Sequence, residues 1–245
     1  MLLRRVTEHI KAQNWTAVGL DFFIVVVGVF IGIQVANWND GRIEGENRAR
    51  YLDELTLDLE LAIAEIDETN AHAQMRVDAG RFLFEDDGAP TAIQSFRRMA
   101  AMFSVENSEQ AMPVDYMPLI FSTARVVDEH GATYQELVST GNIGVLRDRS
   151  LVRALSEYYS RYQEIQTGDE WNWTSSQDVK SKFQSRGIAF TKIMPAEEFV
   201  TTLENDPILE ASLFDATKLS EWQINRLRLL RTETETVLAL LKGAQ

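Results

Sequence analysis

The chain has 245 residues, a formal net charge of −13 and no cysteine. The missing cysteines exclude disulfides, zinc–thiolate sites, iron–sulfur clusters and a cysteine nucleophile. The acidic balance argues against a protein that binds nucleic acid or lies flat on anionic lipid, because both surfaces are negatively charged.

Residues 1–15, MLLRRVTEHIKAQNW, combine apolar residues at helical spacing with basic residues. This pattern predicts a short amphipathic helix at a membrane surface. Arg4, Arg5 and Lys11 could each gain a little from anionic headgroups.

Residues 16–38 are predicted to form a transmembrane helix around the apolar run FFIVVVGVFIGI, Phe22 to Ile33. About 20 mainly apolar residues suffice to cross a bilayer. Trp15 and Trp38 would lie about 35 Å apart along such a helix, which suits tryptophan at the two membrane–water interfaces. A cleaved signal peptide is the competing interpretation, but Gln34 fits poorly three positions before a cut after Ala36.

The orientation follows from length, because basic residues do not decide it: three precede the span and three soon follow it. A short tail stays in the cytoplasm easily, and a long domain translocates largely regardless of its charge. We therefore expect a single-pass protein of a bacterial inner membrane, with residues 1–15 cytoplasmic and residues 39–245 periplasmic. The first 36 residues hold three basic and two acidic residues, so the remainder carries −14.

One stripe of the span is distinctive. Gly28 and Gly32 form a G-x-x-x-G motif, which lets two helix backbones approach closely. At 100° per residue the stripe also contains Asp21, Val25 and Ala36. This stripe is the predicted contact with a partner helix, from another membrane protein or from a second copy. The alternative is an Asp wetted by headgroups, with glycines that are merely frequent in membrane helices.

After the span, NWNDGRIEG at residues 37–45 predicts a turn or a loosened helix. Residues 46–85 repeat apolar residues at three- and four-residue steps, which predicts a long amphipathic helix whose first part continues the span as a stalk. Its apolar positions are Leu52, Leu55, Leu59, Ile63, Ile66, Ala73 and Val77. The run EDDG at residues 85–88 is predicted to end this helix. A solvated loop is the favoured interpretation; the alternative is a calcium site, although EF-hand spacing is missing.

The sequence pattern in the middle of the chain predicts mostly short helices. Pro90 opens one that runs to about Phe103, a loop covers 104–118, and a segment of unassigned type covers 119–129. A short helix at 132–139 and a glycine turn at 141–144 follow. Asp148 is a good N-cap for a helix that extends to about Gln166. Its buried face comprises Leu151, Leu155, Tyr158 or Tyr159, and Tyr162.

Two blocks carry a resemblance to a known family. They are HIKAQNWTAVGLDFFIVVVGVFIGIQVANWND, starting at His9, and YQELVSTGNIGVLRDRSLVRALSEYYS, starting at Tyr134. Together they resemble an uncharacterised bacterial family of single-span proteins, catalogued as a domain of unknown function. The resemblance covers about the first 60 residues and roughly 130–165. It implies a short tail, one span and a helical extramembrane domain, and it supplies no activity or catalytic residue.

Beyond Gln166, Trp171 and Trp173 predict core or interface packing, or a platform for a sugar. Helices are predicted to start at Pro195 and at Asp206-Pro207, and a last helix covers about 215–241. Ser220-x-x-Gln223 is either a capping box or an incident inside that helix. Its apolar side holds Leu219, Trp222, Leu227, Leu230, Val237, Leu238 and Leu241. We expect this helix to pair antiparallel with the helix at 46–85. The predicted fold class is thus all-α, with one transmembrane helix, a long stalk helix and a mainly antiparallel helical bundle.

Residues for catalysis are hard to find. The histidines are His9, His72 and His130, and none has metal-site or catalytic spacing. The pair Asp128 and His130 could act in acid–base chemistry, but an exposed or capping role is simpler. No nucleophile elbow and no phosphate-binding glycine pattern occurs. We expect no enzyme, no cofactor, no metal and no catalytic residue.

The sequence therefore predicts a non-enzymatic interaction protein, anchored in the lipid bilayer and serving as an accessory or stabilising subunit of a larger inner-membrane complex. That complex could be respiratory, transport or photosynthetic. The alternatives are a transmembrane sensor or signalling module, against which the short tail counts, and a membrane-tethered enzyme. The sequence identifies neither the partner nor a ligand of the extramembrane domain.

Overall fold

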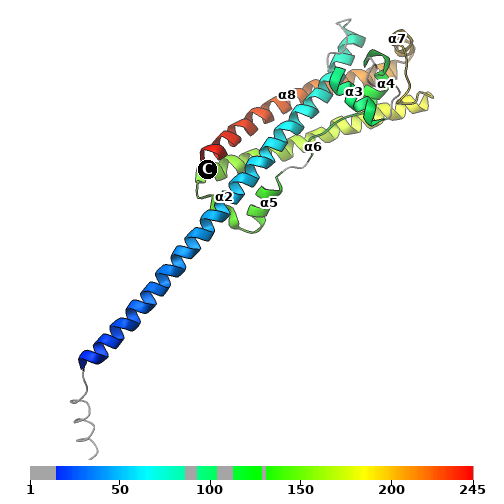
Figure 1. The fold of residues 1–245 in the computed structure, drawn as a ribbon. Coiled ribbons are helices and arrows are strands. Elements are labelled where there is room, and N and C mark those ends of the chain that lie inside the picture. The colour runs from blue at the N-terminus through cyan, green and yellow to red at the C-terminus, as the bar shows by residue number, and fades with distance from the viewer. Residues whose placement is uncertain (1–14, 86–92, 104–112, 129–130, 245) are drawn as a thin grey trace, which may run out of the picture. The chain divides into compact units, whose positions relative to one another are not determined.

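The structure is a computed structural model, and it describes residues 15–85, 93–103, 113–128 and 131–244 (Figure 1). These residues form helices and no strand, so the prediction of an all-helical fold is confirmed for the described ranges. The chain divides into two compact units, residues 1–50 and residues 51–245, and each is treated by itself. Residues 1–14 of the predicted tail at 1–15, with His9 among them, lie outside the described residues, as do Pro90 and His130.

Helix α2 extends from Trp15 to Phe84 without a break. Of the two alternatives predicted for residues 37–45, the turn is therefore wrong and a helix is present, and the end of the helix near residue 85 is confirmed. Gly41 and Gly45 each cost a helix roughly 1 kcal/mol relative to alanine. The ion pair of Arg42 Nη1 with Glu46 Oε1, 2.8 Å long and one turn apart, offsets only a small part of this cost.

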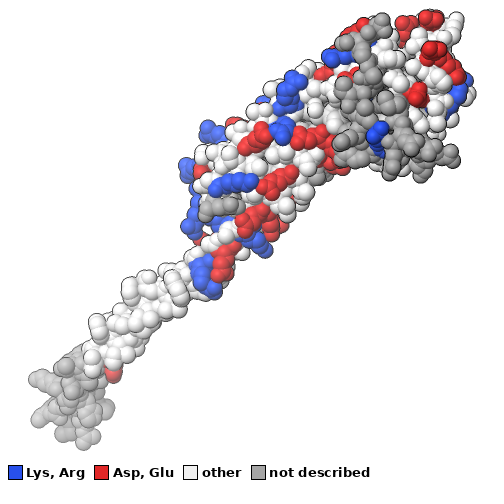
Figure 2. Space-filling view, turned by 45° about the horizontal axis from the view of Figure 1, so that its top comes forward, with Lys and Arg blue, Asp and Glu red and all other residues white. Residues whose placement is uncertain are grey.

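In the first unit, the described part of α2 is long and apolar enough to cross a membrane, judged by length and composition. Its large apolar side chains between Leu20 and Trp38 are almost all exposed, by 46–73%. Figure 2 shows the apolar stretch of this unit almost free of charge, whereas acidic and basic side chains intermingle over the last residues of this unit and over the second unit.

The second unit contains the remainder of α2 and a series of further helices. Their bounds are α3 Ile93–Met102, α4 Met117–Ser122, α5 Ala132–Ser139, α6 Arg149–Ser185, α7 Ala196–Glu204 and α8 Pro207–Ala244, with 3-10 turns η1 Pro113–Asp115 and η2 Asn142–Leu146. The short helix at 132–139 is confirmed. The predicted loop at 104–118 extends too far, because α4 already starts at Met117, and the glycine turn is a 3-10 helix that begins after Gly141.

Helix α6 is 37 residues long and continues well beyond the predicted end at Gln166. Its start is as predicted, because the Asp148 carboxylate accepts hydrogen bonds from the backbone N–H groups of Ser150 and Leu151. The extension was missed because its buried face is partly polar. That face continues at helical spacing through Ile165, Asp169, Asn172, Ser176, Val179 and Phe183.

Helix α8 joins two predicted helices into one of 38 residues that starts at Pro207. Ser220 lies inside it and donates to the Ala216 carbonyl at 2.9 Å, so it caps nothing. Trp222 was predicted on the apolar side of this helix and is 39% exposed. Gln223 is buried instead and donates to the Arg125 carbonyl at 3.0 Å. A buried amide makes the buried face of a helix hard to recognise from the sequence, because polar residues normally lie on the solvent-exposed face.

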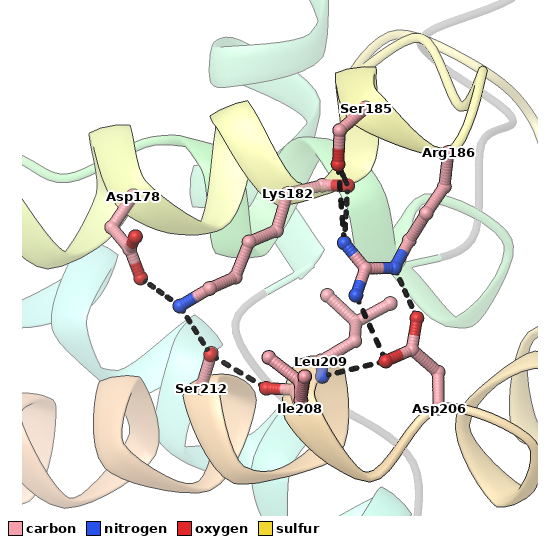
Figure 3. Close-up of polar contacts among 8 residues, drawn as sticks. All are labelled: Asp178, Lys182, Ser185, Arg186, Asp206, Ile208, Leu209 and Ser212. Atoms are coloured by element: carbon pink, nitrogen blue, oxygen red, sulfur yellow. Dashed lines mark hydrogen bonds and ion pairs between the residues drawn. The ribbon is translucent and has the colours of Figure 1, made fainter.

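Charged side chains connect the end of α6 to the start of α8, on either side of α7 (Figure 3). Asp206 Oδ1 accepts from the Leu209 backbone N–H at 3.1 Å and from Arg186 Nη2 at 2.9 Å. The hydrogen bonds from Arg186 hold the pKa of Asp206 below its ordinary value. Lys182 pairs with Asp178 and donates to Ser212 Oγ at 2.7 Å, which ties α6 to α8.

Ion pairs also show which parts of the long helices meet. Arg161 of α6 pairs with Glu233 of α8 at 2.9 Å, whereas Lys182, later in α6, reaches Ser212, earlier in α8. The second half of α2 meets α8 in the same reversed order. Its pairs are Glu60–Lys242 at 2.8 Å and Asp67–Arg231 at 2.6 Å.

Two apolar clusters form the core of the second unit. One gathers the end of α2, α3, α4, α7, the second half of α6 and the start of α8. The other gathers residues 51–66 of α2, the first half of α6 and the end of α8. Buried polar side chains lie between them in sequence along each long helix: Thr69, Asp169, Asn172, Ser176, Thr217, Ser220 and Gln223. Arg76 is also buried, next to Met75 of the first cluster.

Candidate functional site

The predicted contact stripe lies on the exposed part of α2. Asp21, Val25 and Ala36 are exposed, and a Cβ added at Gly28 or Gly32 would meet nothing within 4 Å. The stripe is therefore open in the single chain. Trp38 is also exposed, and Trp15 starts the helix. Whether the stripe contacts a partner, and whether the tryptophans anchor the helix in a bilayer, stay predictions.

The two tryptophans of α6 are separated, as expected for a helix. Trp171 is 63% exposed and stacks on Trp222 with ring centroids 5.6 Å apart, and Arg226 lies over the Trp222 ring. Trp173 is 51% exposed and lines a cavity elsewhere. Core packing is thus the wrong interpretation for both side chains, interface packing stays a prediction, and the pair forms no common platform.

A cavity of about 480 Å³ lies within the second unit, a size typical of small-molecule sites. It is bounded by α2, α3, the segment after α4, α6 and the segment that follows α6. Most of its wall is apolar or aromatic, contributed by Met75, Met99, Met102, Phe103, Trp173 and Phe190. The sequence did not indicate this cavity, because its residues come from five separate segments.

The polar part of the wall centres on His72, Arg125 and Lys180. His72 Nε2 lies 3.2 Å from Met99 Sδ, and Thr123 Oγ1 donates to the same sulfur at 3.2 Å. Arg125 Nη2 bonds Glu65 Oε2 at 2.8 Å and Glu68 Oε2 at 2.9 Å, so its charge is balanced by two carboxylates.

The imidazole of His72 is neutral over the physiological range. Burial, with Arg76 and Arg125 nearby, lowers the pKa of His72 to about 3. A neutral imidazole can donate one hydrogen bond and accept another. In α2, His72 follows Glu68 by one turn, so both side chains face the cavity. A histidine on the apolar face of the predicted helix at 46–85 was the one available signal for this site.

We expect His72 to make the protein acid-sensitive above the range in which carboxylates titrate. A histidine whose folded pKa is lowered from 6.5 contributes stability that is complete above 6.5 and is lost as pH falls toward 3. Between pH 7 and pH 5 this loss is about 2 kcal/mol of unfolding free energy. Urea titrations at both pH values, on the native protein and on His72→Gln, measure it.

The difference between the two proteins isolates His72, because all other titrating groups are common to both. Asp169, whose pKa is raised by burial, acts in the opposite direction and also cancels. Equal loss of stability on acidification in the native protein and in His72→Gln would show that His72 is not the responsible group.

Comparison with protein-family models, with curated proteins and with solved structures finds no match for this chain. The resemblance to a family of single-span proteins therefore stays a prediction from the two sequence blocks. Among the described residues, no group of three or more histidine, aspartate or glutamate side chains is arranged to hold a metal ion.

Proposed function

We propose that the protein is a non-enzymatic, membrane-anchored interaction protein, an accessory or stabilising subunit of a larger inner-membrane complex of respiratory, transport or photosynthetic type. The observation that carries this proposal is the exposed apolar helix of the first unit, whose open glycine face lies within it. Lipid can cover most of such a helix, and a row of small residues favours a second helix at close range.

The proposed topology is a single pass, with the N-terminus in the cytoplasm and the acidic residues 39–245 in the periplasm. In this arrangement the second unit is a mainly antiparallel helical bundle, and α2 supplies both the span and a stalk. The reversed order of the Glu60–Lys242 and Asp67–Arg231 pairs supports the antiparallel part of this proposal. A topology reporter fused to the C-terminus tests the orientation.

The glycine face is tested by Gly28→Leu and Gly32→Leu, which we expect to lower recovery of the native assembly at least about tenfold, because leucine side chains hold the two backbones apart. The protein is purified in mild detergent and sized, and stoichiometric partners are identified. Asp21→Asn distinguishes a need for charge from a need for hydrogen bonding.

Gly19→Leu is the matched control. Gly19 lies in the same helix, its added Cβ would also meet nothing within 4 Å, and it points about 180° away from Gly28. It should leave the assembly intact. A monomer with no stoichiometric partner contradicts the proposal, as does normal assembly of both leucine variants or equal damage by Gly19→Leu.

A further inference from the structure

Lys180 differs from the other lysines that the structure describes. Each of the others forms an ion pair with a carboxylate: Lys182 with Asp178, Lys192 with Glu198, Lys218 with Glu221 and Lys242 with Glu60. Lys180 is half-buried and lines the cavity, and its described contact is the face of the Phe190 ring, 4.3 Å from Nζ to the ring centroid. A half-buried ammonium without a carboxylate is a strong site for an anion, because partial burial reduces screening by water.

The surroundings of Lys180 add to the positive potential. Arg125 is balanced by Glu65 and Glu68, but Arg76 is buried and none of its guanidinium nitrogens has a hydrogen-bond partner among the described residues. Arg76 is close enough to His72 to affect its titration electrostatically. Lys180 and Arg76 thus each carry a positive charge that no carboxylate among the described residues pairs with, although the whole chain carries −13.

The remaining wall suits an apolar body. Thioethers adapt to irregular ligand shapes, and the aromatic rings of Phe103 and Phe190 meet edge to face at 5.7 Å beside them. Met75 and Met99 are almost fully buried and close the inner part of the wall. An ion with no apolar part would leave this surface without a matching contact.

We propose that this cavity binds a small organic anion that combines an apolar or aromatic body with a single carboxylate, and that Lys180 is its counter-ion. His72 offers a neutral hydrogen-bonding group on the facing helix. This site lies within the second unit and does not depend on the proposed helix contact of the first.

The probe is 1-naphthaleneacetate, and its neutral analogue of similar size is 2-(1-naphthyl)ethanol. Each is titrated calorimetrically into the full-length protein in lipid nanodiscs, with empty nanodiscs as the blank for partitioning into lipid. We expect the carboxylate to bind about tenfold more tightly than the alcohol, in line with one partly buried ion pair. Lys180→Met should remove this difference, and Lys180→Arg should retain it.

Lys192→Met is the matched control, because Lys192 is an exposed lysine paired with Glu198. It should bind the carboxylate as the native protein does. No binding beyond empty nanodiscs overturns the proposal. Equal affinity for the two compounds, or an equal effect of the Lys180 and Lys192 substitutions, overturns the role of Lys180 and the anionic ligand class with it.

Discussion

Gly80→Leu is expected to lower the free energy of unfolding by about 3 kcal/mol, because the space beside Gly80 is already filled. A Cβ built on Gly80 would lie 2.8 Å from Thr217 Cβ and closer still to both branches of that side chain. Thr217 cannot easily rotate away, since its hydroxyl donates to the Leu213 carbonyl at 2.8 Å. Urea titration followed by circular dichroism of the full-length protein measures the change.

Gly45→Leu is the control for the substitution itself. Gly45 also lies in α2, but an added Cβ would meet nothing within 4 Å there, so stability should stay within about 0.5 kcal/mol or rise. A double-mutant cycle of Gly80→Ala with Thr217→Ala then isolates the contact. We expect Thr217→Ala to relieve part of the damage, with a coupling of about 1 kcal/mol. If the two changes are simply additive, α2 and α8 do not meet at these residues.

The sequence predicts some helix ends correctly and misses others, and each case has a physical reason. The helix starts at Asp148 and Pro207 can be predicted from the sequence. An N-cap side chain and the fixed φ angle of proline both act on the nearest residues. The end of α6 was misplaced because Asp169, Asn172 and Ser176 are buried, so the apolar period vanishes where the helix continues. After the span, the sequence left a turn and a loosened helix open, and the structure has the helix, because two glycines weaken a helix without ending it.

The cavity was beyond prediction for a geometric reason. Met75, Met99, Phe103 and Phe190 belong to separate elements, and nothing in their spacing links them. Lys180 is informative only once its neighbours are known, because a lysine on a helix is normally a solvated residue. The stripe at Gly28 and Gly32 is the reverse case. It can be predicted from spacing alone, since a single helix fixes which residues share a face.

Arg76→Met is expected to raise the free energy of unfolding by about 3 kcal/mol at neutral pH. The Arg76 side chain is 1% exposed, and its three nitrogens have no hydrogen-bond partner in the described structure. Burial lowers the pKa of Arg76 from 12.5 to about 10, so the folded state holds the charge at a cost throughout the range below pH 10. Methionine has a similar length and carries no charge, and replacing buried ions by apolar groups is often stabilising.

Arg228→Met is the control, because Arg228 is exposed on α8 and its substitution should change stability by no more than about 0.5 kcal/mol. The sign of the Arg76 result is decisive. A gain in stability means that the guanidinium is a buried charge tolerated for a reason other than folding, as expected if it adds positive potential beside an anion site. A loss contradicts the prediction, because it means that the guanidinium or its packing stabilises the folded protein. Repeating both titrations with saturating 1-naphthaleneacetate connects the two results, because an anion bound near Arg76 would stabilise the native protein more than Arg76→Met.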